Sequence, residues 1–466
     1  MSNRLELSRR RDKLSSKHGR VKMEGKRKGA RQTAFNVLNR VEGGDAFADI
    51  LLMKETEGLS ALDAGLSTEI VYGVLRWKMR LDNAIDLFAS IRTKKLEHRV
   101  LNALRIGTYQ LLFLDRVPSS AAINESVKLL RKDGARKSGF VNALLRKIDS
   151  ERPSVRLPED AAPEKRISVE FSHPEWLVRR WALRYGLAEA EALCKANQEP
   201  PPRVVRVNTL VTARTELMES LAAAGFKAAA SVYSPFAVEV IGGGPLDALD
   251  RRYYIQDEAS QLVSTLLSPE PGSKVLDACS APGGKTTHLA QLMENRGSIL
   301  ALDKSISRLK SVESTALRLG VGIIRTEAVD ASSPLAFAKE GSFDYILVDA
   351  PCTGLGVVRR SPDIKYRRRE DDIASAALIQ SALLMNLSCY LKKGGVLVYS
   401  TCTFEPEETE EVVGGFLERN PGFCLEDAAK ALPDGCAPLV DEKGFFRPLP
   451  HKHGMDGFFG ARLRKL

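Results

Sequence analysis

The chain has 466 residues, of which 44% are hydrophobic and 27% charged, and its formal net charge is +10. This length exceeds one usual hydrophobic core, so we expect two or three domains. With no apolar run of about 18 residues a membrane-spanning helix is excluded, and with no apolar segment after the basic start a secretory signal is disfavoured.

The cysteine spacing and the distribution of charge further limit which kinds of protein this chain can be. Seven cysteines without C-x-x-C spacing favour neither a zinc site nor a disulfide framework, and we expect reduced thiols in the cytoplasm. Residues 1–31 contain twelve Lys and Arg and three acidic residues, which leaves a net charge of only +1 for the rest. We expect residues 1–27 to form a disordered basic tail that contacts RNA phosphates loosely, although a merely solvating tail fits the composition equally well.

Residues 28–149 follow a helical pattern throughout, as in Ala34, Val37, Leu38 and Val41. Helices are predicted to start after Ser67 and near residues 119–120. There is no strand-like alternation and no catalytic cluster, which is typical of a binding module. The stretches 118–127 and 139–146 resemble the RNA-binding NusB-like domain, and this resemblance implies RNA contact without catalysis.

Residues 150–163 are rich in proline and predict a linker. Helical patterns resume from Pro174 to Asn197, a strand is predicted at 203–208, and a helix is predicted at about 213–224 with Thr212 as its N-cap. Residues 164–253 are therefore expected to form a small α+β segment that connects the domains and contacts RNA.

From residue 254 to 466 strands alternate with helices, which predicts a mainly parallel, doubly wound, Rossmann-like sheet. The predicted strands are Val275–Asp277, Ile299–Asp303, Ile323–Thr326, Tyr345–Asp349 and Val396–Ser400. The carboxyl ends of these strands should meet at one edge, where such sheets bind their ligands.

A glycine-containing turn follows the first of these strands. Counting back from Gly284-Lys285-Thr286 places Cys279 where a phosphate-binding P-loop requires Gly, and the G-x-G-x-x-G fingerprint is also absent. These mismatches disfavour a nucleotide hydrolase and a dinucleotide enzyme. A nucleoside-binding turn of another kind and an ordinary helix-capping turn both remain.

Acidic residues stand at the ends of successive strands. Asp277, Asp303 and Asp349 close three of them, and Asp330 follows a fourth. Asp303 lies where a carboxylate can accept both ribose hydroxyls, and Asp330 could meet an adenine amino group. Each residue alone is more commonly a helix cap, but together they indicate an adenosine-containing cofactor.

Two cysteines, Cys352 and Cys402, follow two of the strands in polar turns. A buried cysteine usually behaves as a small hydrophobic residue, and a catalytic thiol needs positive charge nearby, for which Lys285 is a candidate. The spacing alone leaves both interpretations open.

The order of these motifs, together with residues 362–365 and 399–403, resembles the Sun (Fmu-like) family of S-adenosylmethionine-dependent RNA cytosine-5 methyltransferases over residues 170–466. The resemblance implies that Cys402 is the nucleophile, that Cys352 assists product release and that Asp349 contacts the base. It implies S-adenosylmethionine as cofactor and no metal. The cofactor-binding residues that it implies are Cys279, Ser280, Ala281, Pro282, Gly283, Gly284, Lys285, Asp303, Asp330 and Asp349.

With the NusB-like domain in front, the resemblance implies 16S ribosomal RNA or an early assembly intermediate as the partner, no membrane partner, and a monomer. The alternatives are the same chemistry on transfer RNA and a noncatalytic RNA-binding assembly factor. We also expect the six cations of residues 359–369 to contact RNA phosphates beside the catalytic edge.

Overall fold

The computed structural model describes residues 29–466, apart from residues 45, 153–155, 158–160 and 245. The predicted tail 1–27 lies outside the described residues, as does part of the predicted linker. Among the residues described, no helix has the length and apolar character needed to cross a bilayer, and no group of three His, Cys, Asp or Glu is arranged to hold a metal ion.

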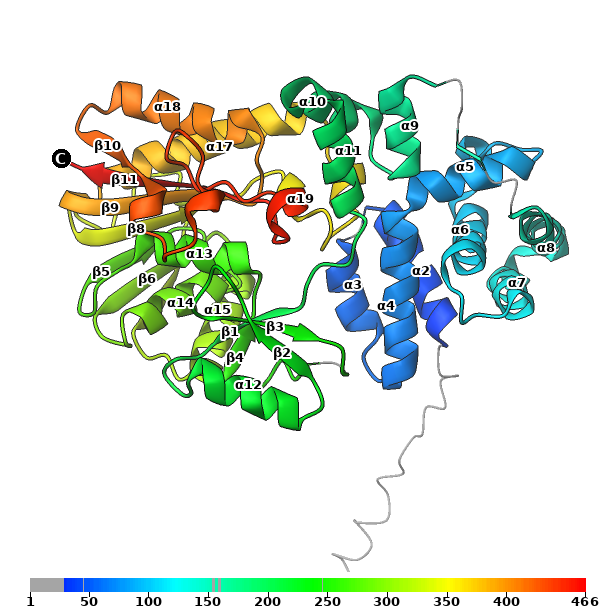
Figure 1. The fold of residues 1–466 in the computed structure, drawn as a ribbon, viewed down its shortest axis with the longest axis horizontal. Helices are drawn as coiled ribbons and strands as arrows, with labels where there is room; N and C mark the ends of the chain where they lie inside the picture. The colour runs from blue at the N-terminus through cyan, green and yellow to red at the C-terminus, as the bar shows by residue number, and fades with distance from the viewer. Residues whose placement is uncertain (1–28, 45, 153–155, 158–160, 245) are drawn as a thin grey trace, which may run out of the picture.

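The N-terminal part is an all-α bundle (Figure 1). Its helices are α2 (Ala30–Glu42), α3 (Ala48–Glu55), α4 (Ala61–Arg76), α5 (Lys78–Phe88), α6 (His98–Phe113), α7 (Ser119–Lys128) and α8 (Ala135–Ser150), with 3-10 turns η1 (Thr93–Lys95) and η2 (Arg131–Asp133). Every residue of α6 from Val100 to Leu111 is buried, and α2, α4, α5, α7 and α8 pack around it. The predicted start after Ser67 is wrong, because Ser60 caps α4 by accepting the Asp63 N–H at 3.1 Å.

Three helices follow, namely α9 (Pro163–Glu170), α10 (Glu175–Tyr185) and α11 (Leu187–Ala196). They pack between the bundle and the C-terminal part (Figure 1). Trp181 of α10 is fully buried, and its Nε1–H donates to Glu405 Oε1 at 2.8 Å. This contact joins helix α10 to the loop that follows Cys402.

A small antiparallel sheet comes next, with the strand order β2-β3-β1-β4. Its elements are β1 (Val204–Val207), α12 (Arg214–Ala223), β2 (Lys227–Ala230), β3 (Ala237–Ile241) and β4 (Tyr253–Ile255). The residue that caps α12 is Ala213, one position after the predicted Thr212. The fully buried Arg206 of β1 donates to Thr287 Oγ1 at 3.0 Å, and this bond fixes the small sheet to the neighbouring domain.

The C-terminal part is a seven-stranded sheet with the order β10-β11-β9-β8-β5-β6-β7. Its strands are β5 (Lys274–Asp277), β6 (Ser298–Asp303), β7 (Ile324–Ala328), β8 (Phe343–Asp349), β9 (Leu391–Thr401), β10 (Phe423–Glu426) and β11 (Phe459–Lys465). Strands β5 to β9 pair in parallel, whereas β10 and β11 add to one edge antiparallel. The parallel strands are rich in buried Val, Leu and Ile because helices cover both faces of the sheet.

One face of this sheet is covered by α13 (Glu258–Leu267), α14 (Gly284–Leu292) and α15 (Ile306–Leu319), and the other by α17 (Asp371–Ser388) and α18 (Glu410–Arg419) (Figure 1). The short elements are η4 (Leu355–Val357), α16 (Ile364–Arg367), η5 (Pro406–Glu408), η6 (Ala428–Lys430), η7 (Ala437–Leu439) and α19 (Pro450–His453). The predicted fold class, an all-α bundle, a small α+β segment and a Rossmann-like α/β domain, is confirmed.

Candidate active site

The turn between β5 and α14 is held tightly against β6. The backbone N–H and the hydroxyl of Ser280 both donate to the Leu302 carbonyl, at 2.9 and 3.0 Å. Gly283 has a φ of +105°, and a Cβ there would lie 3.0 Å from the Val312 Cα. Because only glycine meets both conditions without strain, the turn can bring its backbone close to a ligand.

A cavity of about 180 Å³ lies over this turn. Predicted residues that line it are Cys279, Ser280, Ala281, Pro282, Gly284, Lys285 and Asp349. Gly283 supports the turn from behind, outside the lining. Four further residues line it that were not predicted as site residues, namely Tyr254, Gln256, Ser260 and Asp277. Asp277 was predicted to stand at the ligand edge of the sheet but was given no binding role, and the other three carry no local motif.

Asp277 is almost completely buried beneath the cavity, at 1% exposure. Burial raises the pKa of its carboxyl to about 7, although the Thr286 hydroxyl, which donates to Oδ2 at 2.7 Å, opposes the rise. Among the described residues, Oδ1 has no hydrogen-bond partner. A buried acceptor facing a cavity without a partner suits a site that receives a polar ligand.

Asp349, at the end of β8, is held on both oxygens. Lys285 Nζ lies 2.7 Å from Oδ2, and the Ser400 hydroxyl donates to Oδ1 at 2.8 Å. Burial works against the charge of Lys285, but the Asp349 carboxylate outweighs it and the pKa of Lys285 is raised. The site therefore contains a fixed carboxylate beside a fixed cation.

Asp303 and Asp330 stand at the same edge of the sheet but outside the cavity lining. Asp303 is buried; it accepts the Ser305 N–H at 2.9 Å and lies 3.1 Å from Arg308 Nη1. Asp330 is half-exposed, and hydrogen bonds from Ser332 followed by the Lys304 ammonium lower its pKa to about 2. Both carboxylates are therefore already engaged by their own neighbours.

The two predicted thiols are in contact. Cys352 follows β8 and Cys402 follows the adjacent strand β9, and their Sγ atoms lie 3.1 Å apart. The hydrogen bond to Cys402, with burial, raises the pKa of Cys352 well above its usual value. The Lys285 charge interacts with the Cys402 thiol. Cys352 is thus a thiol that keeps its proton while its sulfur touches that of Cys402.

Backbone contacts set the position of these two loops. The Gly356 N–H donates to the Cys402 carbonyl at 3.0 Å, and the Gly457 N–H donates to the Gly356 carbonyl at 2.8 Å. A Cβ on Gly356 would lie 2.0 Å from the Gly457 oxygen. No residue other than glycine fits this approach without moving a backbone.

Glu408 holds the Cys352 loop from below and was missed by the sequence analysis. Its buried carboxylate accepts the Thr353 N–H at 2.9 Å and the Gln380 side-chain amide at 2.9 Å. Burial raises its pKa. In the sequence Glu408 stands in a run of glutamates that looks like the exposed start of a helix, so no local signal marks it.

The prediction that the cations of residues 359–369 contact RNA phosphates is wrong for those that the structure buries. Arg359 is 4% exposed and pairs with Asp456 at 2.8 Å, and Lys365 is 0% exposed and donates to the Arg76 carbonyl of α4 at 3.1 Å. Arg360 is ion-paired to Asp257 at 2.6 Å. The physical reason is twofold: the helical bundle docks on Lys365, and two carboxylates of the C-terminal part, Asp257 and Asp456, pair with the two arginines.

The three remaining cations of residues 359–369 have other surroundings. Arg367 donates to the Ala46 carbonyl, again at the boundary with the bundle, and Arg368 Nε donates to the Thr353 carbonyl at 2.8 Å. Arg369 is exposed. Arg368 is therefore the cation of this segment that contacts the loop of Cys352, and Arg369 is the one that is open to solvent.

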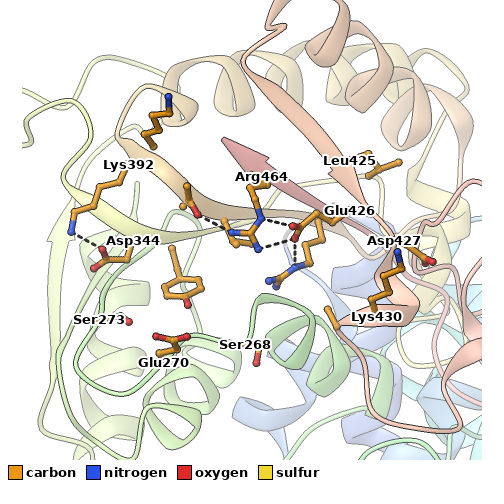
Figure 2. A pocket seen from close by; sticks show the side chains of 17 residues that line it. Ser268, Glu270, Ser273, Asp344, Lys392, Leu425, Glu426, Asp427, Lys430 and Arg464 are labelled. Atoms are coloured by element: carbon orange, nitrogen blue, oxygen red, sulfur yellow. Dashed lines mark hydrogen bonds and ion pairs between the residues drawn. The ribbon is translucent and has the colours of Figure 1, made fainter. Parts of the chain in front are cut away.

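A larger cavity, of about 950 Å³, lies at the opposite edge of the sheet and contains none of the predicted residues (Figure 2). Its polar side chains are largely paired with one another, as in Lys392 with Asp344 at 2.5 Å and Arg462 with Glu426 at 2.7 Å. It lies at the amino ends of β5, β8 and β9, away from the usual ligand edge of such sheets.

Comparison with known families gives three matches. The family described as 16S rRNA methyltransferase RsmB/F matches residues 264–464, the NusB family matches residues 28–150, and the ferredoxin-like domain of RsmF/B-like methyltransferases matches residues 173–247.

Similar proteins extend over nearly the whole chain. A Bacillus subtilis (strain 168) protein named probable ribosomal RNA small subunit methyltransferase B is 39% identical over 94% of this chain and 99% of its own length. The ribosomal RNA small subunit methyltransferase B of Pseudomonas syringae pv. tomato is 35% identical over 94% of this chain and 97% of its own.

Two solved structures are also similar. The crystal structure of PH0851 covers 94% of this chain and 99% of its own at 27% identity, with a TM-score of 0.79. NSun6 from Pyrococcus horikoshii with SFG, an analogue of S-adenosylmethionine, covers 63% of this chain and 98% of its own at 28% identity, with a TM-score of 0.56.

Proposed function

Because the chain belongs to the 16S rRNA methyltransferase RsmB/F family, we propose that it methylates C5 of a cytosine in 16S ribosomal RNA through a covalent cysteine adduct. The methyl donor is S-adenosylmethionine. The observation that carries the finer proposal is the 3.1 Å contact between Cys352 and Cys402 beside the Lys285–Asp349 ion pair.

The cavity over the glycine turn suits the cofactor, because it offers close backbone approach and the Oδ1 atom of Asp277, which has no hydrogen-bond partner in the part of the chain that the structure describes. Residues Cys279 to Lys285, with Asp303, Asp330 and Asp349, would hold S-adenosylmethionine. Bound there, it supplies an electrophilic methyl group.

The residues of this chain would act on the cytosine in a definite order. Carbon C5 of cytosine is a poor nucleophile, and addition of the Cys402 thiolate to C6 pushes electron density toward C5. Asp349, fixed by Lys285 and Ser400, would accept a hydrogen bond from the amino group at the base edge near N3, and the Lys285 ammonium would offset the negative charge that this addition creates.

Once C5 is methylated, its proton passes to a water molecule, the electron pair of that C–H bond restores the C5–C6 double bond, and the bond between C6 and the Cys402 sulfur breaks. Cys352 is suited to assist this release, because its raised pKa keeps a proton on the sulfur that contacts Cys402. A neutral thiol at this distance can hydrogen-bond the departing thiolate and favour its expulsion. The target base must leave any stacked helix to reach these groups.

Methyl transfer from labelled S-adenosylmethionine to 16S RNA tests the proposal. We expect the wild type to label C5 of a cytosine, Cys402→Ala to be inactive, and Cys352→Ala to accumulate a protein–RNA adduct. Cys389→Ala is the matched control, because Cys389 hydrogen-bonds the Asn386 carbonyl away from the site.

Three other results would change the proposed nucleophile, substrate or activity. Full activity of Cys402→Ala would remove it as the nucleophile. Labelling of transfer RNA in place of 16S RNA would change the substrate, and RNA binding without any methyl transfer would favour an assembly factor.

A further inference from the structure

Two segments of the helical bundle carry an unusual excess of positive charge. Residues 92–99 and 131–137 together contain eight Lys and Arg and only two acidic residues. We call them the distal basic surface; its cations are Arg92, Lys94, Lys95, Arg99, Arg131, Lys132, Arg136 and Lys137. The net charge of the chain gives no sign of this surface, because acidic residues elsewhere balance its cations and residues 32–466 carry a net charge of only +1.

The fold brings these two segments together. Arg99, at the start of α6, forms a bidentate pair with Asp133 at 2.8 and 3.0 Å, and Lys137, at the start of α8, pairs with Glu97 at 2.6 Å. Thr93, buried at 5%, bonds Asp86 and fixes the η1 turn. The surface is therefore a single ordered patch.

Both acidic residues of the patch are used in these two pairs. Six cations remain exposed and, among the residues that the structure describes, make no ion pair, namely Arg92, Lys94, Lys95, Arg131, Lys132 and Arg136. Six unneutralised cations on one ordered face form a strongly positive potential.

We propose that the distal basic surface binds backbone phosphates of the RNA substrate, away from the methylated base. The patch is rich in Lys and Arg and offers few groups to read base edges, which fits sequence-independent contact. In Figure 1, α8 lies at the end of the molecule opposite the large sheet. The substrate is thus an extended RNA that reaches from the thiol pair to the far end of the bundle. This inference rests on the proposed function for the identity of the RNA.

The test neutralises four of the cations, with Lys94→Gln, Lys95→Gln, Arg131→Gln and Lys132→Gln in one variant. A matched control neutralises four exposed cations elsewhere, with Lys54→Gln, Arg116→Gln, Lys310→Gln and Lys443→Gln. The first variant should bind a long 16S RNA fragment about tenfold or more weakly at moderate salt. Its salt dependence should also be shallower, by roughly 0.7 to 0.9 in the slope of log K against log salt for every phosphate that the variant no longer neutralises.

Kinetics add a second readout. KM for the long RNA should rise with kcat unchanged, while a hairpin that carries only the target loop should be methylated as by the wild type. Equal losses in both variants would overturn the proposal, as would loss of binding to phosphatidylglycerol vesicles with RNA binding intact. Absence of methyl transfer by the wild type would instead refute the proposed function, and the binding comparison would still decide the role of this surface.

Discussion

The buried carboxyl of Asp277 makes stability depend on pH. Its pKa is about 7 in the folded chain against an ordinary value of 3.8, and the largest cause is burial. Below pH 3.8 both states hold the proton and there is no effect. Between these values the unfolded chain ionises while the folded chain keeps its proton, so the free energy of unfolding falls as pH rises and levels off above pH 7.

The size of this effect on the free energy of unfolding follows from the difference between the folded and unfolded pKa values of Asp277. Each pH unit is worth about 1.4 kcal/mol, so holding Asp277 in the folded chain costs about 4 kcal/mol at pH 8. In Asp277→Asn this cost disappears. The amide oxygen can still accept the Thr286 hydroxyl, and the amide nitrogen takes the place of Oδ1, which has no partner to lose among the described residues.

Urea unfolding of wild type and Asp277→Asn at pH 5 and pH 8 measures this difference. We expect the variant to be the more stable protein at pH 8, by up to about 4 kcal/mol, with most of the advantage gone by pH 5. Asp330→Asn is a control of opposite sign, because the lowered pKa of Asp330 stabilises the ionised fold at pH 8. If Asp277→Asn destabilises the chain equally at both pH values, the assigned burial penalty is wrong.

Two further substitutions and one chemical treatment test the loops that carry Cys352 and Cys402 and the lysine of the same site. Gly356→Ala should lower the free energy of unfolding by about 3 kcal/mol in urea, because its Cβ would lie 2.0 Å from the Gly457 oxygen; a change below 1 kcal/mol would show that the loops separate easily. Treatment with diamide should join Cys352 to Cys402, whose Sγ atoms lie 3.1 Å apart, and abolish methyl transfer until dithiothreitol is added; mass spectrometry that finds other cysteines joined first would contradict this. Lys285→Met should reduce kcat at least tenfold with the fold retained by circular dichroism, and unchanged kcat would remove its ion pair from the proposed chemistry.

Local patterns were sufficient for the order of the elements at the candidate site. The strands that end at Asp303 and Asp349 were predicted with their correct last residues, because apolar periodicity and turn residues are properties of neighbouring positions. The predicted start of a helix was wrong where two residues in the sequence could each begin it. Ser60 rather than Ser67 begins α4, since both serines precede apolar residues and only packing distinguishes them.

The sequence by itself determined which chemical groups stand at the strand ends, because a strand exit and the following turn are encoded within about ten residues. It did not determine their charge or access to solvent. Lys365 belongs to a basic run that is typical of a solvent-exposed surface, yet it is fully buried against Arg76, a residue 289 positions earlier. Burial of this kind depends on which distant segments pack together, so only the tertiary structure decided that Lys365 serves the domain boundary and that Asp277 lies beneath a cavity.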